Sequence, residues 1–191
     1  MEERGSRMGI IVLSTLIEKI LKEKVYFNGN DLVMSISSKE SLLKVVYCLK
    51  KHTEFQFTQL IDLYGIDYPL KKERFELQYV LWSHLFNIRL RIKVRVEGDQ
   101  GIDSLTTLYP SANWLERECW DMFGIFFLNH PDLRRILTDY GFDGFPLRKD
   151  FPVSGFVEVH YNEDQNKIVY EGVELTQEYR LFHFLSPWEK K

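Results

Sequence analysis

The side chains most capable of chemistry gather between residues 116 and 152. Carboxylates, an imidazole and guanidinium groups occur there together, and these are the groups that acid–base catalysis and anion binding use. The candidates are Glu116, Arg117, Glu118, Asp121, His130, Arg134, Arg135, Arg148, Lys149 and Asp150. Catalysis by the acids and recognition of an anion by the arginines are both open, and both compete with ion pairing inside the chain.

The acidic group suits ion pairs better than catalysis. Glu116 and Glu118 are two residues apart, so on a helix they point to different faces. Arg117 and Asp121 are four apart and can pair on one outer face. Acid–base catalysis would also need a pocket and a substrate-binding group, and the sequence shows neither. We therefore interpret these acids as partners of cations or of backbone amides.

The arginines and the histidine also have structural roles open to them. The pairs Arg134-Arg135 and Arg148-Lys149 could clamp a carboxylate or a phosphate. Alternatively they pair with the nearby aspartates, which are Asp132, Asp139, Asp143 and Asp150. His130 could carry protons near neutral pH, but no second histidine or cysteine lies near it in the sequence. A structural histidine bonded to backbone or to a carboxylate is favoured.

Cofactor chemistry has little support in the sequence. Cys48 and Cys119 are the two cysteines, whereas an iron–sulfur cluster held by one chain needs about four thiolates. The patterns GxGxxG, GxxxxGK[ST], HExxH and GxSxG do not occur. The formal net charge of −3 argues against a nucleic-acid binder. With no run of about 18 apolar residues, we expect no transmembrane segment, no nucleic-acid partner and no cofactor of the chain's own.

A helix over residues 113–123 is expected to position the first acids. Asn113 with Glu116 fits an N-terminal capping box. The apolar stripe contains Leu115, Cys119, Met122 and Phe123. Gly124 can end the helix in a left-handed conformation.

The regular pattern fades after this helix. Residues 125–191 keep many aromatic residues and charges of both signs, which is unlike a disordered tail. Long irregular segments are usually functional or bound to something. We therefore expect an extended C-terminal arm over 125–191 that docks on partner subunits, with short strands at 156–161 and 167–170.

The preceding residues predict an α+β fold with two layers, a mixed or antiparallel sheet and packed helices. Residues 1–24 predict an amphipathic helix that packs on its own domain or on a partner. The α+β domain is expected over 25–124. Its elements are a hairpin at 25–36, a helix begun by a capping box of Ser37 with Glu40, and strands at 55–66, 74–86 and 88–97.

The strand at 88–97 is the clearest of these elements. Five apolar residues alternate with four basic ones, which are Arg89, Arg91, Lys93 and Arg95. Period-two alternation places all the cations on one face of a sheet. That face is either an ordinary solvated face or a docking surface for an acidic partner, and both interpretations stay open.

Three motifs resemble a known family. They are ERECWDMFG at 116–124, HPDLRRIL at 130–137 and PLRKDF at 146–151. Their types and spacing resemble the thirty-kilodalton subunit family of respiratory complex I, the NADH:ubiquinone oxidoreductase, whose members are the bacterial C subunit and the mitochondrial subunit nine. IDLYGIDYP at 61–69 and ERFELQYVL at 73–81 match in type, and the ending with LTQEYR and SPWE is similar to mitochondrial and related proteobacterial members.

The resemblance implies a structural and assembly subunit of the quinone-reducing module in the peripheral arm. Its partners would be chiefly the forty-nine-kilodalton-type subunit and the neighbouring iron–sulfur subunits, which carry the cofactors. The implied location is the matrix side of the mitochondrial inner membrane, or the cytoplasmic face if the chain is bacterial. The expected partner interface comprises Glu116, Arg117, Glu118, Asp121, His130, Arg134, Arg135, Pro146, Leu147, Arg148, Lys149 and Asp150.

Two other functions are kept as alternatives. The first is the equivalent subunit of a related plastid-type or hydrogenase complex, although the mitochondrial-like ending speaks against it. The second is an independent hydrolase or anion-binding enzyme that uses Glu118, His130 and Arg134.

Overall fold

The computed structural model describes residues 2–28, 31–36, 38, 41–98, 100–177 and 180. It divides into two compact units, Met1–Phe151 and Pro152–Lys191, whereas the sequence placed the start of the arm at residue 125. Residues 125–151 belong to the first unit because they bond to the elements before them. The Leu147 amide, for example, donates to the Met122 carbonyl at 3.1 Å. Docking of the arm on partners stays a prediction.

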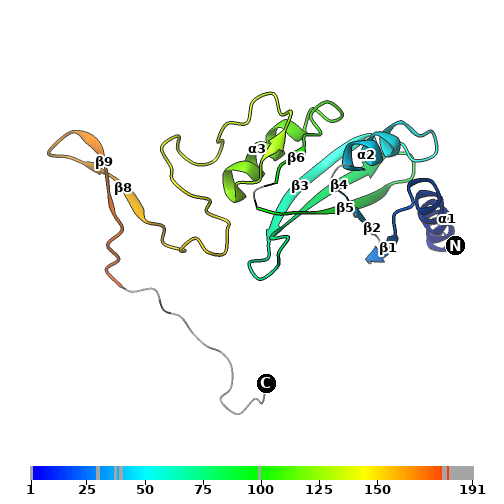
Figure 1. Ribbon diagram of the computed structural model, residues 1–191, viewed down its shortest axis with the longest axis horizontal. Helices are drawn as coiled ribbons and strands as arrows, with labels where there is room; N and C mark the ends of the chain where they lie inside the picture. Colours follow the sequence, from blue (N-terminus) through cyan, green and yellow to red (C-terminus); the bar gives the residue numbers. More distant parts are fainter. Residues whose placement is uncertain are drawn as a thin grey trace, which may run out of the picture. The chain divides into compact units, whose positions relative to one another are not determined.

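The first unit contains a five-stranded mixed sheet with the order β1-β2-β5-β4-β3 (Figure 1). The strands are β1 (Val25–Asn28), β2 (Asp31–Ile36), β3 (Gln59–Asp67), β4 (Phe75–Ser83) and β5 (Ile88–Val96). β2 and β5 pair in parallel, and the other neighbours pair antiparallel. The predicted hairpin, strands and α+β class are confirmed, with strand ends that differ by a few residues.

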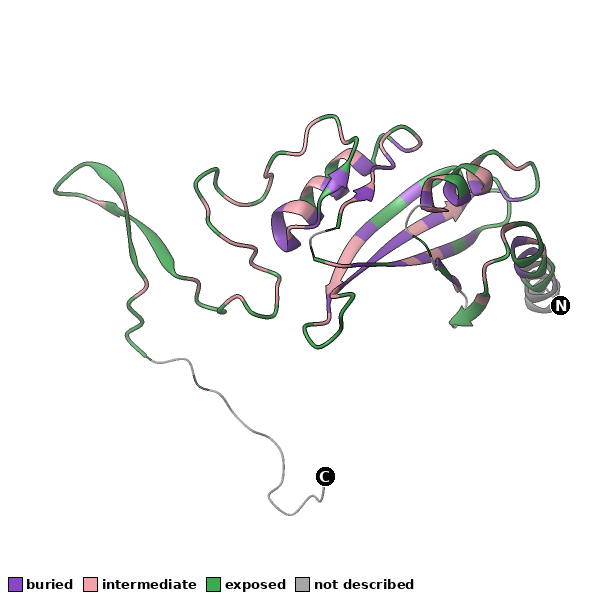
Figure 2. Ribbon diagram, viewed as in Figure 1, coloured by how far each residue is buried: buried purple, intermediate pink, exposed green. Residues whose placement is uncertain are grey.

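Three helices of the described chain pack on one face of this sheet. They are α1 (Glu2–Leu21), α2 (Leu42–Lys51) and α3 (Ala112–Phe123). Ile17 of α1, Leu49 of α2 and Met122 of α3 join one core cluster with Leu90 and Ile92 of β5. Figure 2 shows buried residues along the strands and on α2 and α3. In the part of the chain that the structure describes, no helix is both long and apolar enough to cross a membrane.

α3 also covers the outer edge of β3. The Ser111 hydroxyl donates to the Leu60 carbonyl at 3.2 Å, and the Cys119 thiol lies 3.7 Å from the Leu63 carbonyl oxygen. An open strand edge offers unpaired backbone groups to other chains. These side chains occupy part of that edge, so α3 is anchored beside β3.

The remaining strands form two small sheets. β6 (Ile102–Asp103) and β7 (Phe127–Leu128) pair in parallel in the first unit. β8 (Val157–Asn162) and β9 (Lys167–Gly172) form an antiparallel hairpin in the second unit. The two short strands predicted in the arm are therefore confirmed.

The predicted helix starts need correction. α3 begins at Ala112 with Ser111 as N-cap and has no side-chain cap bond. The capping box of Asn113 with Glu116 is wrong, because the Glu116 side chain is buried and bonds to the segment before the helix. The pair Ser37 and Glu40 lies outside the described residues. The predicted end of α3 is confirmed, since Gly124 has φ 73°.

Candidate functional site

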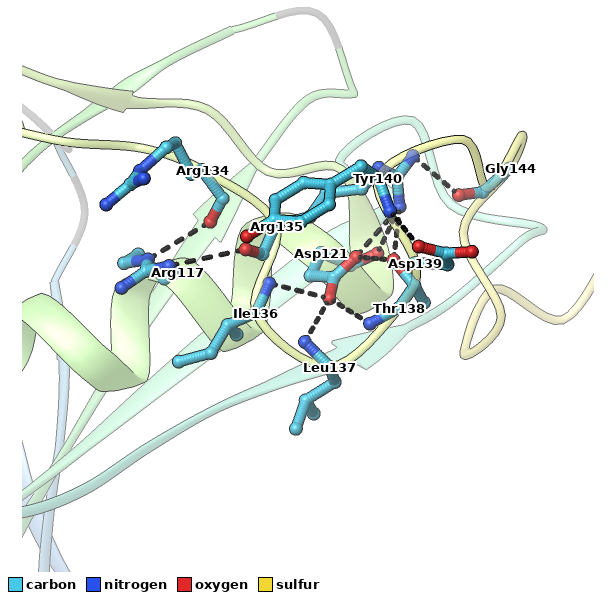
Figure 3. Close-up of polar contacts among 10 residues, drawn as sticks. All are labelled: Arg117, Asp121, Arg134, Arg135, Ile136, Leu137, Thr138, Asp139, Tyr140 and Gly144. Carbon is cyan, nitrogen blue, oxygen red and sulfur yellow. Dashed lines mark hydrogen bonds and ion pairs between the residues drawn. The ribbon is translucent and has the colours of Figure 1, made fainter.

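The centre of the candidate site is the Asp121 carboxylate near the end of α3. Its Oδ2 accepts hydrogen bonds from three successive amides, those of Ile136, Leu137 and Thr138, at 3.1, 2.7 and 2.8 Å. Its Oδ1 accepts from the Thr138 hydroxyl at 2.5 Å and from Arg135 Nη1 at 2.8 Å. Figure 3 shows these donors converging on one side chain. Asp121 therefore shapes the irregular segment that follows the helix.

The environment of Asp121 keeps it ionised. Its side chain is fully buried, and burial by itself raises a carboxyl pKa. The hydrogen bonds from Thr138, Leu137 and Arg135 outweigh burial and hold the pKa of the Asp121 carboxyl well below its ordinary value. A buried charge satisfied in this way is a structural anchor, with no lone pair directed to a substrate.

Arg135 ties a second part of the segment to the same anchor. Besides Asp121, its guanidinium donates to the Gly144 carbonyl at 3.0 Å (Figure 3). The rings of Phe142 and Phe145 lie 5.8 and 5.3 Å from it, within cation–π range. The aromatic residues of this irregular segment therefore pack around a cation that neutralises Asp121.

Of two expected ion pairs of arginines, one is absent and the other is present. Arg117 donates to the carbonyls of Arg134 and Arg135 at 3.1 and 3.3 Å, so its predicted pair with Asp121 is wrong. Arg117 bonds to these carbonyls because residues 134–135 cross the helix beside it. Asp121 points instead toward the amides of residues 136–138. Arg134 pairs with Asp132 at 2.7 Å, as the balanced charges of this stretch predict.

Glu116 has a different environment from Asp121. Its side chain is fully buried, and it accepts hydrogen bonds from the Ser104 hydroxyl at 2.6 Å and from the Leu105 amide at 2.7 Å. Burial raises the pKa of its carboxyl to about 7, and the two hydrogen bonds only partly oppose this. Glu116 thus fastens the segment before α3 to the helix.

His130 lies beside Glu116 as a neutral, satisfied side chain. Its Nδ1 accepts from the Asp132 amide at 3.0 Å, so the proton belongs on Nε2, which lies 3.3 Å from the Asn113 carbonyl oxygen. Burial lowers its pKa. The distance of 3.8 Å from Nε2 to the Glu116 carboxylate is too long for a hydrogen bond. The structural interpretation of this histidine is favoured.

A second anchor joins residues 149–150 to the β3–β4 hairpin. Asp67 is buried and accepts from Arg74 Nε at 2.7 Å and from the Lys149 amide at 2.8 Å. Arg74 also donates to both carboxylate oxygens of Asp150, at 3.1 and 2.8 Å. The Arg74 hydrogen bonds lower the pKa of Asp67 despite its burial. We call these four residues the Arg74 clasp.

Arg148 completes the attachment of the segment. Its Nε donates to the Phe123 carbonyl at 2.6 Å, and its guanidinium lies 4.3 Å from the Phe145 ring and 5.2 Å from the Phe75 ring. A Cβ on Gly124 would lie only 2.5 Å from this guanidinium. The left-handed glycine therefore provides both the end of α3 and the space for Arg148.

The structure gathers most of the predicted interface residues around α3, but not as a catalytic group. Glu118 is exposed, both ring nitrogens of His130 are engaged, and Arg134 is paired with an exposed Asp132. Pro146 is half-buried and Leu147 is 51% exposed. Among the described residues, no group of three His, Cys, Asp or Glu is arranged to hold a metal. This geometry indicates that these residues fix the conformation of the segment after α3 rather than catalyse a reaction.

Sequence reasoning missed two functional residues, Asp67 and Arg74. Each lies in a stretch that matched the family in type, IDLYGIDYP at 61–69 and ERFELQYVL at 73–81. The pairing of Arg74 with Asp150 could not be predicted from the sequence, because the two residues are 76 positions apart in the chain. A charged residue inside a matching hydrophobic stretch was the available signal.

Comparisons with known proteins identify the family and the fold of the chain. Residues 36–157, more than half of the chain, match the family described as "Respiratory-chain NADH dehydrogenase, 30 Kd subunit". A similar solved structure, the trypsin-resistant fragment 1–134 of Nqo5, is 28% identical, covers 65% of this chain and 99% of its own, and has a TM-score of 0.50. A chain of a membrane-bound sulfane sulfur reductase, 22% identical with a TM-score of 0.64, covers 76% of this chain and 86% of its own, and shows the fold alone.

Curated relatives cover nearly the whole chain. NADH-ubiquinone oxidoreductase subunit 9 of Reclinomonas americana is 47% identical over 94% of this chain and 87% of its own length. A subunit of the NADH-quinone oxidoreductase of Parvibaculum lavamentivorans is 45% identical over 99% and 93%. The chain therefore belongs to the 30 kDa subunit family of respiratory complex I and is a subunit of NADH:ubiquinone oxidoreductase.

Proposed function

We propose that this chain is a structural and assembly subunit of the quinone-reducing module in the peripheral arm of complex I. It supports electron transfer from NADH to ubiquinone by holding its neighbours in place. Its chief partners are the forty-nine-kilodalton-type subunit and the neighbouring iron–sulfur subunits, and its place is the matrix side of the mitochondrial inner membrane. Family membership and the shape-holding chemistry around Asp121 support this role.

The observation that carries the proposal is the two-faced hairpin of β8 and β9. Its register places five apolar side chains on one face, which are Val157, Val159, Tyr161, Ile168 and Tyr170. Each is between 56% and 61% exposed, and Figure 2 shows the hairpin as almost wholly exposed. An isolated two-stranded hairpin is marginally stable in water. A partner that covers the apolar face would supply the missing burial.

The thiols of the chain do not fit an iron–sulfur cluster. Relatives from plants carry the name NADH dehydrogenase [ubiquinone] iron-sulfur protein 3, one of them 53% identical in Arabidopsis thaliana. Here Cys119 is 2% exposed, and burial raises the pKa of its thiol, which disfavours the thiolate that iron requires. Cys48 is the single other cysteine. We therefore place the flavin and the clusters of electron transfer on neighbouring subunits.

The alternative complexes have weaker support. The likeness to the sulfane sulfur reductase chain concerns the fold, whereas relatives at 45–53% identity are named as NADH oxidoreductase or NADH dehydrogenase proteins. A hydrolase with Glu118, His130 and Arg134 lacks a free acid–base pair, since His130 is bonded on both sides. The assembly role is thus the function we put forward.

The test introduces glutamine on the apolar face of the hairpin and, as a control, on its opposite face. Val159→Gln with Tyr170→Gln removes apolar surface from the covered face, and each large apolar side chain buried there stabilises by about 1.5–3 kcal/mol. We expect complex I assembled in cells to fall several-fold on native gels. His160→Gln, on the opposite face, is the control and should assemble normally.

The folding of the first unit serves as a second readout. Because the substituted residues lie in the second unit, the unfolding midpoint of residues 2–151 within the full chain should not change. Equal assembly of the double variant and the His160→Gln control would refute docking through this hairpin face.

A further inference from the structure

The face of the sheet opposite the three helices has many long polar and charged side chains. The residues that define this basic sheet face are Tyr26, Glu76, Arg89, Arg91, Lys93 and Arg95, which the strand register places on one side. Val33 lies on the same side and is fully buried, although it is outside the core cluster. The long side chains therefore lie flat over the sheet and cover it, and no described helix packs there.

Two of the four cations on the basic sheet face form no ion pair with its acids. Arg91 pairs with Asp31 at 2.7 Å, and Arg95 lies 3.6 Å from Glu76. Arg89 is exposed, and neither it nor Lys93 forms an ion pair with any described residue. Two cations on this face thus have no ion-pair partner among the described residues, although the strand register places Asp62 on the same face and Glu73 lines a hollow beside Lys93.

The two cations without an ion pair, Arg89 and Lys93, have neighbours that suit a protein interface. Arg89 lies opposite Trp82 in the register of β4 and β5, and arginine and tryptophan are the residues most enriched at interface hot spots. Lys93 lies 5.8 Å from the Tyr26 ring. Arg89 and Lys93 are four positions apart on β5, which corresponds to about 13 Å. The face thus presents two cations at a fixed spacing, one opposite Trp82 in the strand register and the other 5.8 Å from the Tyr26 ring.

A hollow beside Lys93 gives this face a place for a side chain. It has a volume of about 340 Å³, and its walls include Ser35, Lys93, Arg95, Glu73 and Glu76. The two glutamates disfavour a free phosphate or another small multivalent anion. A single carboxylate, held there by a segment that is also anchored at Arg89, could approach Lys93 and the Ser35 hydroxyl from the open side.

We propose that the basic sheet face binds an acidic segment of a partner protein. The segment carries two carboxylates about 13 Å apart, one on Arg89 beside Trp82 and the other on Lys93 at the hollow. The argument is charge complementarity at a fixed spacing. The basic sheet face belongs to the first unit, and the apolar hairpin face belongs to the second. The two docking proposals therefore use different residues, and an experiment can refute one without refuting the other.

The first experiment uses a carbodiimide on purified complex I, because this reagent joins an amine to a carboxylate that touches it. We expect Lys93 to be joined to an aspartate or glutamate of another subunit, identified by mass spectrometry of the linked peptides. Lys44 on α2 is exposed and lies in the helical layer, so it serves as the internal control. Failure to find any link from Lys93 to another chain would overturn the proposal.

The second experiment reverses the charges. Arg89→Glu with Lys93→Glu should lower the retention of the linked subunit in a salt wash about tenfold. The control, Lys44→Glu with Lys51→Glu, makes the same charge change on α2 and should leave retention unchanged. Lys93→Gln with Arg89→Gln removes both charges without adding repulsion and should give an intermediate loss of retention. This variant replaces the charge-reversed one if the latter fails to fold.

Other occupants give distinguishable outcomes, and each contradicts the proposal. Links from Lys93 only to Glu158, Glu171 or other acids of this same sequence would assign the face to the chain itself or to a second copy. Absence of a cross-chain link, together with loss of binding to phosphatidylserine vesicles in the reversed variant, would assign it to anionic lipid.

Discussion

At the scale of single residues, two buried carboxylates on one helix behave in opposite ways. Asp121 receives five hydrogen bonds, one of them from a guanidinium, and its pKa is lowered. Glu116 receives two neutral hydrogen bonds, and its pKa is raised to about 7. Burial penalises both charges, so the number and charge of the donors decide the direction. Neither carboxylate is available to a substrate.

This contrast predicts how stability depends on pH. The Glu116 contribution is fully present below its unfolded pKa of 4.5 and is lost as pH rises through about 7. The loss corresponds to about 3 kcal/mol. Glu116→Gln keeps an acceptor for the Leu105 amide and can donate to Ser104, so it should flatten the decline between pH 4.5 and 7. Urea unfolding of both proteins across this range measures it.

The acid side of the same curve is the internal control. The Asp121 contribution is present above its unfolded pKa of 3.8 and is lost as pH falls, and Glu116→Gln should not alter that limb. An unchanged slope between pH 4.5 and 7 in the variant would show that Glu116 is ionised in the folded chain.

At the scale of elements, close contacts attach the irregular segment and α3 to the sheet. Gly65 of β3 allows the Phe123 ring of α3 to approach, because a Cβ there would lie 2.9 Å from the ring. The Arg74 clasp fastens residues 149–150 to the β3–β4 hairpin with charged hydrogen bonds. The segment after α3 thus has a defined path although its regular secondary structure is limited to the two residues of β7.

The clasp predicts an effect of a conservative substitution. Arg74→Lys keeps the charge but cannot donate to Asp67 and Asp150 together through one planar fork. We expect a loss of about 1–2 kcal/mol in unfolding free energy and faster hydrogen exchange at the Lys149 amide. Arg95→Lys is the control, because the Arg95 side chain is 53% exposed and lies 3.6 Å from Glu76, too far for a short charged hydrogen bond. Slow exchange at Lys149 in Arg74→Lys would argue against the clasp.

At the scale of the whole molecule, the two units differ in how much of their apolar surface is buried. Every buried hydrophobic residue found in the described chain lies between Leu13 and Phe127, within the first unit. The described residues of the second unit instead expose most of their large apolar side chains. The first unit therefore has the burial that stable folding needs, whereas a two-stranded hairpin such as β8–β9 is only marginally stable in water by itself.

This division predicts that the first unit folds by itself. A chain that ends at Phe151 should unfold within about 3 °C of the full chain, because it retains the whole core and the Arg74 clasp. The same truncation should abolish assembly into complex I, since the hairpin is gone. Calorimetry and native gels measure the two effects, and a truncated chain that unfolds much earlier would show that the second unit stabilises the first.

Local patterns were sufficient for the elements and the family. The alternation over 88–97 predicted β5 and its charged face because strand periodicity is a property of neighbouring residues. Gly124 predicted the end of α3, because left-handed backbone favours glycine. The motifs at 116–151 indicated the family and gathered most of the candidate site. These successes concern backbone conformation and strand periodicity, which depend on neighbouring residues, and for these features sequence spacing is a reliable guide.

Only the tertiary structure decided which partners these residues choose. Glu116 bonds to Ser104 and not to the predicted helix cap. Arg117 bonds to carbonyls 17 and 18 positions away and not to Asp121. Arg74 joined Asp150 across 76 positions. The physical reason is that burial makes an unsatisfied donor or acceptor costly, so the contact that completes the packing prevails over the nearest one along the chain. Composition and periodicity contain no information about such long-range contacts.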